Sequence, residues 1–548
     1  MFLSRCMPIG LAFLVLSLVS QSVAAKQSAS PSTETPIAYL VVIFMENTSF
    51  DASFGTYPNA LNPPGSPAFA AKPGTGSVNG LTETLLLFNP NTSNPFRIGR
   101  LDSYTCDQNH KYTEELNARN GGLMNQFVQF GAEGPGTPPQ FCHQNADNDW
   151  DTDMGYFDGN TVTALWNYAQ RFAMSDNNFA TMAGESARGA QNLVRGDATG
   201  ALCVPATKGS KAGNIFVPNM GVLPPCNGPV DSNAQPPPSD PNGLTGVLGD
   251  DLDPYYDICS KSEETTAFTG RNIGNLLNDA GITWGWFQGG FEDCSRTSNV
   301  DVWLAAKAQA GEPVAPPTPL TDYVPHYNPF QYFQSTSNPM HLPPDSVATI
   351  GHTDKANHLY GLRWFFEAAE SGNLPTVSYL KPIATQTGHP GHSDPLDQQF
   401  FLVETLNRLQ QLKEWKQMAV IVAWDDSDGW YDHVMGPVIN TSNTMNDDGL
   451  CGAETQGAGT RCGYGPRLPL LVISPYAKGN YVSHQLTDQT SILRFIEDNW
   501  LGGERISATS FDNMAGSLMD LFDFSAPKNS GRFILDPFTG QPKGQNGK

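Results

Sequence analysis

Acidic and amide side chains follow two long apolar runs of the sequence. The pair Glu46-Asn47 comes directly after the first run, and the pair Asp425-Asp426 comes directly after a later one. Open α/β sheets bind ligands where buried strands end, and carboxylates gathered there need a cation or protons to offset their charge. Oxygen ligands favour one hard divalent ion such as Mg²⁺, Ca²⁺ or Mn²⁺. The alternative is that these residues only cap and turn the chain.

Ser186 lies in a turn of small residues, GESARG at 184–189, just before a helical stretch. A serine at this place presents its hydroxyl beside the free N–H groups of a helix start, and those groups stabilise an anion such as a phosphoryl oxygen. The alternative is an ordinary serine N-cap. Position 188 is Arg, not the second Gly of the G-x-S-x-G elbow, which counts against a serine esterase.

Three histidines are candidates for proton transfer and charge stabilisation: His110, His326 and His389. His389 lies in the loop TGHPGHSD, which separates a predicted strand from a predicted helix. Taken singly, a histidine is more often structural or exposed than catalytic. A catalytic role for these histidines is therefore supported only if the fold brings them to the same sheet edge as Ser186.

Continuous apolar runs predict the strands that must position these residues. Runs that are apolar on both faces are typical of a parallel sheet covered by helices on both sides. The predicted strands are 37–45, 282–287, 376–380, 418–424 and 468–473, and the predicted helices are 161–172, 395–415 and 487–500. Strands that alternate with helices predict an α/β fold with a central, mostly parallel sheet, helices on both faces and loop-rich insertions.

The composition excludes some classes of function. Of the 548 residues 39% are hydrophobic and 16% charged, which is typical of a globular protein, and the formal net charge is −23. Proteins that bind nucleic acid usually carry a basic face, so nucleic acid is not an expected partner.

The N-terminal residues 1–25 have the form of an export signal, with Arg5 before an apolar stretch and small residues at the end. The rest of the chain holds no run near the ~20 apolar residues that span a bilayer. A secreted or periplasmic protein is therefore expected. Its predicted divisions are a linker at 26–36, one catalytic domain at 37–525 with insertions near 205–250 and 309–320, and a C-terminal tail at 526–548.

Eight cysteines remain after residues 1–25, an even number that predicts up to four disulfides in an exported chain. The simplest pairing is sequential: Cys106–Cys142, Cys203–Cys226, Cys259–Cys294 and Cys451–Cys462.

Taken together, the motifs resemble the bacterial phosphoesterase family, which includes secreted acid phosphatases and phospholipases C within the alkaline phosphatase superfamily. The resemblance covers residues 37–525. The matching segments are FMENTSFD at 44–51, MGYFD at 154–158, SARGAQN at 186–192, NPFQYF at 328–333, DDSDGWYDH at 425–433 and GPRLP at 465–469. It implies an alkaline phosphatase-like fold.

The resemblance also implies roles for single residues. Ser186 would attack phosphorus and become phosphorylated, while touching a metal ion surrounded by the four residues at the two strand ends: Glu46, Asn47, Asp425 and Asp426. The groups that would donate hydrogen bonds to the phosphoryl oxygens, or a proton to the leaving group, are Asn47, His110, His326 and His389. Two positions depart from the family pattern: Tyr327 stands where a second histidine is frequent, and Thr48 stands where an arginine is common.

Three functions remain open on the sequence. The first, which the sequence favours over the other two, is hydrolysis of soluble phosphate monoesters, as in an acid phosphatase, with an acidic optimum. The second is a phospholipase C that acts on phosphatidylcholine-type lipids. The third is a secreted, non-enzymatic ligand-binding protein.

Overall fold

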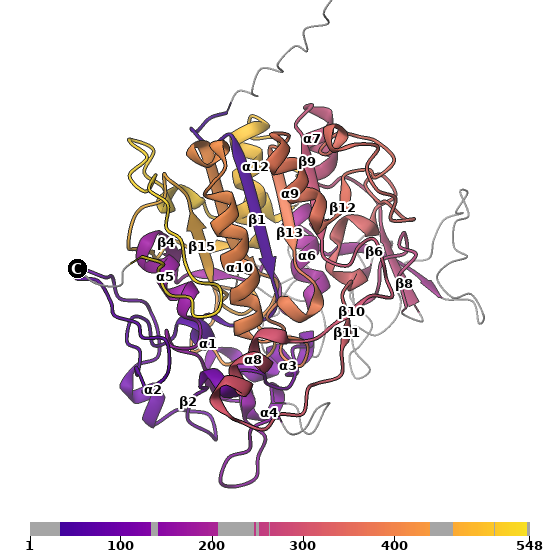
Figure 1. Cartoon of the computed structure of the whole chain (residues 1–548). Coiled ribbons are helices and arrows are strands. Elements are labelled where there is room, and N and C mark those ends of the chain that lie inside the picture. The colour runs from indigo at the N-terminus through magenta and orange to yellow at the C-terminus, as the bar shows by residue number, and fades with distance from the viewer. Residues whose placement is uncertain are drawn as a thin grey trace, which may run out of the picture.

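A computed structural model describes residues 33–132, 141–205, 246–247, 251–261, 264–438, 464–508 and 510–544. Its centre is an eight-stranded sheet, in the order β12-β9-β13-β1-β14-β15-β4-β16 (Figure 1). The strands are β1 (Tyr39–Met45), β4 (Ala173–Ser175), β9 (Trp284–Gln288), β12 (Leu359–Gly361), β13 (Val377–Lys381), β14 (Met418–Trp424), β15 (Leu470–Ile473) and β16 (Tyr481–Ser483). Only β15 runs antiparallel to its neighbours in this sheet.

The register of the two central strands brings the predicted metal ligands together. β1 and β14 are parallel and in full register, from Tyr39 opposite Met418 to Met45 opposite Trp424. The residues that follow, Glu46 and Asp425, therefore leave the sheet side by side. Both strands are apolar and almost wholly buried, which pins this register against a slip.

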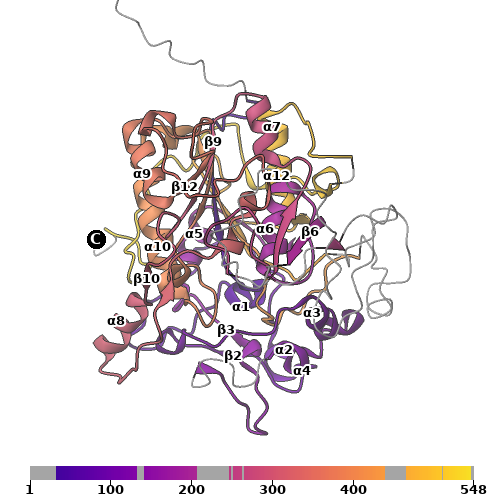
Figure 2. The ribbon, with the colours of Figure 1, turned by 90° about the vertical axis from the view of Figure 1, so that its right-hand side faces the viewer.

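Helices cover both faces of the sheet, as the sequence predicts (Figures 1 and 2). One face carries α5 (Thr163–Arg171), α9 (Leu362–Ser371) and α10 (Pro395–Leu409). The other face carries α6 (Ser186–Arg195), α7 (Ile273–Asp279) and α12 (Gln489–Trp500). The chain has the predicted α/β fold.

Further helices gather beyond the carboxyl ends of the sheet strands (Figure 1). The helices there are α1 (Phe50–Phe54), α2 (Glu83–Leu87), α3 (Tyr112–Arg119), α4 (Phe127–Phe130) and α8 (Asp301–Ala310). Small sheets pair β2 (Phe96–Arg97) with β3 (Gly155–Tyr156), β10 (Thr297–Ser298) with β11 (Leu320–Thr321), β5 (Asn178–Phe179) with β17 (Thr487–Asp488), and β6 (Thr199–Pro205) with β7 (Gly246–Val247) and β8 (Glu264–Phe268).

Each predicted strand is present in the sheet, and the bounds of β14 agree at both ends. The helix predicted at 395–415 is shorter: α10 ends at Leu409, and a separate 3₁₀ turn, Lys413–Gln417, buries Trp415 before β14 begins. Asp394 caps α10 as the sequence suggests, because its side chain accepts the N–H of Leu396.

The segment assigned to the C-terminal tail lies against the body of the protein in its described part. Leu535 is fully buried, and its backbone exchanges hydrogen bonds with the side chain of Asn407 on α10. The ring of Phe533 makes edge-to-face contacts with the rings of Tyr168 and Phe172. These residues close the outer side of α5 and α10.

Two of the predicted disulfides are present, Cys106–Cys142 and Cys259–Cys294. The other two pairings, the export signal at 1–25 and most of the insertion at 205–250 lie outside the described residues. Within the described part of the chain, no helix combines the length and apolar character needed to cross a bilayer.

Candidate active site

Ser186 meets the residues from the two strand ends at one point, here called the carboxylate centre (Glu46, Asn47, Ser186, Asp425 and Asp426). Its hydroxyl lies 3.0 Å from Glu46 Oε2 and 3.0 Å from Asp426 Oδ2, and 3.5 Å from Asn47 Oδ1. All five side chains are buried. The fold thus brings into contact a set of groups that the sequence carries at two strand ends and one turn.

The turn before α6 aims the serine into this centre. Gly184 has a φ of +101°, and a Cβ there would collide with the Arg188 side chain, so the turn requires glycine. Glu185 is the N-cap, and Ser186 is the first residue of the helix. The sequence alternative, in which Ser186 caps the helix, is therefore wrong: its hydroxyl faces the carboxylates instead of its own backbone.

Lys381, the last residue of β13, also enters the carboxylate centre. Its ammonium forms a close ion pair with Glu46 and lies 3.4 Å from Asp425 Oδ2. Lys381 was not among the predicted site residues, although it directly follows the predicted strand 376–380 and the same strand-end rule applies to it. Tyr327, where the family pattern has a second histidine, places its ring 4.4 Å from the Lys381 ammonium.

The charges of the carboxylate centre do not balance. Burial and the neighbouring Asp425 raise the pKa of Glu46 well above its ordinary value, although Lys381 acts in the opposite direction. Burial also raises the pKa of Asp426 well above its ordinary value. Three buried carboxylates face one ammonium, so the ionised centre keeps a negative charge that a cation would offset. Its oxygen donors fit a hard divalent ion.

A second set of residues, the imidazole group (His110, His389 and Asp428), adjoins this centre. The Nδ1 atoms of His110 and His389 lie 3.6 and 3.9 Å from Asp428 Oδ1. Asn47 joins the two sets, because its Nδ2 donates to Asp428 Oδ1 at 3.1 Å. Asp428 belongs to the DDSDGWYDH motif at 425–433, but its position there did not predict a role for it.

Backbone carbonyl groups fix the two imidazole rings. His110 Nδ1 lies 2.7 Å from the carbonyl oxygen of Gln108, and His389 Nδ1 lies 2.6 Å from that of Pro390. Burial alone lowers the pKa of His110, but the nearby aspartates outweigh it and raise the pKa well above its ordinary value. Burial and the neighbouring His110 lower the pKa of His389 to about 3. The two rings thus differ in charge at neutral pH.

His326 lies in a different pair of contacts, on the 3₁₀ turn Pro325–Tyr327. Its ring nitrogens lie 3.5 Å from Asp251 and 3.6 Å from Asp253. Asp251 also accepts the N–H of Ala187, the residue after the serine, at 2.9 Å. His326 is therefore linked to the start of α6 through Asp251. No periodicity in the sequence marked the two aspartates, which follow the predicted insertion.

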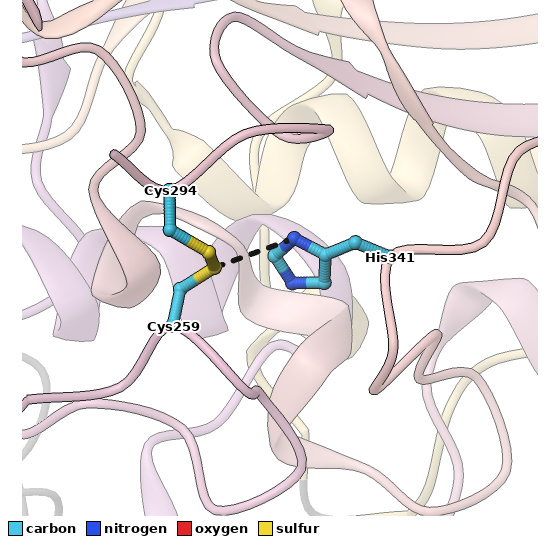
Figure 3. A group of neighbouring side chains, drawn as sticks. All are labelled: Cys259, Cys294 and His341. Atoms are coloured by element: carbon cyan, nitrogen blue, oxygen red, sulfur yellow. Dashed lines mark hydrogen bonds between the residues drawn. A yellow bond between two sulfur atoms is a disulfide. The ribbon is translucent and has the colours of Figure 1, made fainter. Parts of the chain in front are cut away.

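A buried group behind this segment surrounds the disulfide Cys259–Cys294 (Figure 3). His341 faces the disulfide with its Nδ1 3.5 Å from Cys259 Sγ, and its Nε2 lies 2.9 Å from Asp257 Oδ1. Asp257 also accepts the hydroxyl of Tyr323 at 2.5 Å. The disulfide fixes Cys259 to Cys294, and the hydrogen bonds of Asp257 hold the residues just before Cys259. The group therefore stabilises the segment that carries Asp251 and Asp253.

An ion network ties the loops after β1 and β14 together. The fully buried Arg467 donates to Asp51 Oδ1 at 2.9 Å and to Asp432 Oδ2 at 3.1 Å. His433 Nδ1 lies 2.6 Å from the other oxygen of Asp51. These residues come from the FMENTSFD, DDSDGWYDH and GPRLP segments, so the network joins three of the motifs in space.

Comparison with known proteins gives relatives for part of the chain. A non-hemolytic phospholipase C from Pseudomonas aeruginosa is 31% identical over 174 residues, 29% of this chain and 25% of that protein. Phospholipase C A from Mycobacterium tuberculosis is 29% identical over 175 residues, 31% of this chain and 33% of that protein. Non-specific phospholipase C1 from Arabidopsis thaliana is 30% identical over 135 residues, 23% of this chain and 24% of that protein. The matches thus span about a quarter to a third of each relative.

Among solved structures, a protein in the alkaline phosphatase superfamily from Vibrio parahaemolyticus aligns with a TM-score of 0.27 and 11% identity, over 78% of this chain and 72% of that one. The model of the Phosphoesterase family matches residues 37–501, which include both strand ends, the serine turn and the three histidines. The chain belongs to the Phosphoesterase family.

Proposed function

We propose that the protein hydrolyses phosphoric ester bonds with Ser186 as the nucleophile. The observation that carries the proposal is the position of Ser186, the first residue of α6. Its hydroxyl lies 3.0 Å from a carboxylate oxygen of Glu46 and 3.0 Å from one of Asp426. Oxygen from the serine would bond to phosphorus while the bond to the leaving alcohol breaks. Water would then hydrolyse the phosphoserine in a second step.

One divalent ion fits the carboxylate centre, held by Glu46, Asn47, Asp425 and Asp426. Such an ion, when bound, favours the ionised serine and stabilises negative charge on the phosphoryl oxygens. The support for it is the unbalanced charge of the four buried side chains around Ser186. Mg²⁺, Ca²⁺ and Mn²⁺ all suit these oxygen donors.

The histidines take complementary roles in this proposal. His110, which keeps its proton, donates a hydrogen bond to a phosphoryl oxygen or a proton to the leaving alcohol. In His389, the hydrogen bond to Pro390 places the ring proton on Nδ1 and leaves Nε2 as an acceptor. His326 acts from the side of the α6 N-terminus, where Asp251 orients it.

For the substrate, the comparisons favour the second alternative of the sequence analysis over the first. The relatives described above are named as phospholipases C. We therefore place phosphatidylcholine-type lipids before soluble phosphate monoesters. An exposed apolar surface at and beside α2 supports this order: Leu61, Leu87 and Phe88 are 68%, 53% and 78% exposed. Leu61 and Leu87 line a groove of about 720 Å³.

We also propose that the protein is exported, to the periplasm or the exterior. The two disulfides support this, because disulfides persist in oxidising compartments.

The deciding assay compares phosphatidylcholine vesicles with a soluble aryl phosphate across pH 4–8. We expect kcat/KM to be at least ~10-fold higher on the lipid, which corresponds to about 1.4 kcal/mol of transition-state preference. A preference of the same size for the aryl phosphate would instead favour the phosphomonoesterase function over the phospholipase C function. Release of neither product at any pH, with or without added divalent ions, would contradict both.

A further inference from the structure

Glu115 on α3 contacts both segments that form the carboxylate centre. Its Oε2 accepts the N–H of Gly184 at 2.6 Å, in the turn before Ser186. Its Oε1 accepts the hydroxyl of Ser427 at 2.8 Å, between Asp426 and Asp428. We propose that Glu115 is a positioning residue, which sets the distance between the nucleophile's turn and the loop that carries the acidic ligands; this rests on the proposed role of Ser186.

The contacts are well placed to transmit position. Gly184 is two residues before Ser186, and Ser427 directly follows Asp426. One hydrogen bond therefore holds the backbone near the reacting serine, and the other holds the side chain next to a ligating aspartate. Glu115 is buried, and a hydrogen bond to a buried carboxylate is among the stronger kinds in a protein. One rigid carboxylate therefore joins two loops that the sheet itself does not connect.

Other contacts hold α3 in place, so Glu115 is carried by a fixed element. Arg119 at the end of the helix donates to the carbonyl oxygen of Tyr464 at 2.7 Å. Leu116 and Ala118 of the same helix are buried. Loss of the Glu115 carboxylate should therefore loosen the two loops without removing the helix. Displacements of about 1 Å at a reacting group can cost about 100-fold in rate.

Four variants test the proposal: Glu115→Ala, Glu115→Gln, Ser427→Ala and the double variant Glu115→Ala/Ser427→Ala. Gln keeps one oxygen for the Gly184 N–H, and its amide can donate to the Ser427 hydroxyl, so both links survive. Glu404→Gln is the matched control, since Glu404 is exposed on α10. Each protein is assayed with its bound metal, on the substrate that the wild type hydrolyses best.

We expect Glu115→Ala to lower kcat about 30- to 100-fold with KM within about 3-fold, because positioning acts on the chemical step. Glu115→Gln should stay within about 5-fold of the wild type, and Glu404→Gln should be unchanged. Ser427→Ala should lower kcat about 5- to 10-fold, and adding it to Glu115→Ala should cost nothing more, since the two residues act through one link.

Additive losses in the double variant, a kcat within about 3-fold of wild type in Glu115→Ala, or a raised KM with unchanged kcat would overturn the proposal. If Glu115→Ala does not fold, Ser427→Ala decides: a lowered kcat supports the link, and an unchanged kcat refutes it. Failure of the proposed function is a separate result, since it appears as turnover by Ser186→Ala or as an inactive wild type.

Discussion

The carboxylate centre and the imidazole group lie side by side and are both buried, but their charges are offset by different groups. In the carboxylate centre, acidic groups face one another and the Ser186 hydroxyl, with Lys381 as a partial counter-charge. In the imidazole group, each ring is fixed by a backbone carbonyl, and one ring is neutral. In the proposed mechanism a divalent ion offsets the charge of the first set, whereas in the second set protein groups hold both rings. The proposal therefore assigns the binding of an ion and the orientation of proton donors to two adjacent sets of residues.

The largest expected effect is that of Ser186→Ala, which removes the only proposed nucleophile. We expect kcat to fall by at least about 1,000-fold, with no trapped phosphoenzyme after acid quench, while the protein still folds. The variant tests whether the carboxylate centre does chemistry or only holds an ion. A variant that keeps more than roughly a tenth of the wild-type rate would remove Ser186 from the mechanism.

A pair of aspartate variants sharpens the comparison. Asp426→Asn should lose the divalent ion and at least about 100-fold in kcat, because it removes a ligand charge from the carboxylate centre. Asp428→Asn should keep the ion and lose activity only through misoriented histidines. Elemental analysis of both purified proteins measures the difference, with the wild type at one ion per chain as reference.

Loss of the ion from both aspartate variants would indicate that the two sets form one metal site, and retention by both would show that Asp426 is not a ligand. A wild type that holds no metal and is indifferent to strong chelators would contradict the ion altogether.

The smallest effect concerns the neutral ring of the imidazole group. Because burial lowers the pKa of His389 to about 3, the unfolded chain takes up a proton below about pH 6.5 that the folded chain does not. His389 therefore costs stability as pH falls from about 6.5 towards 3, by about 1.4 kcal/mol per unit. His389→Asn, which can still donate to Pro390, should flatten the fall of Tm between pH 6.5 and 4 and lower kcat about 10-fold or more.

Melting curves of wild type and His389→Asn at matched pH values make this measurement, with activity assayed at pH 7. If Tm depends on pH in the same way in both proteins, the His389 ring is charged in the folded protein. His110 and His389 would then not differ in charge.

The sequence was most informative where buried strands end. Apolar runs located β1 and β14, and the residues directly after them, Glu46 and Asp425, proved adjacent because the two strands pair in register. The same rule would have found Lys381, which directly follows the predicted strand 376–380 and is the last residue of β13. The three-residue strands β4, β12 and β16 carry too few residues for a pattern.

Glu115 and Asp251 could not be predicted in the same way. They reach the site from a helix and a loop whose paths depend on packing against distant parts of the chain, and no local pattern marks them. The histidines form an intermediate case. The motifs predicted His110, His326 and His389 as one group of candidates. Only the fold shows that His326 contacts Asp251 and Asp253, whereas the other two share Asp428.

The central position of β1 has a consequence for biosynthesis. This strand leaves the ribosome early, but its two neighbours, β13 and β14, are translated only after most of the chain, since Leu40 pairs with Val377 and Tyr39 with Met418. Until then a seven-residue apolar segment has both edges unpaired. Contacts this distant in sequence close slowly, and exposed strand edges aggregate. The central sheet can therefore assemble only after most of the chain has been made.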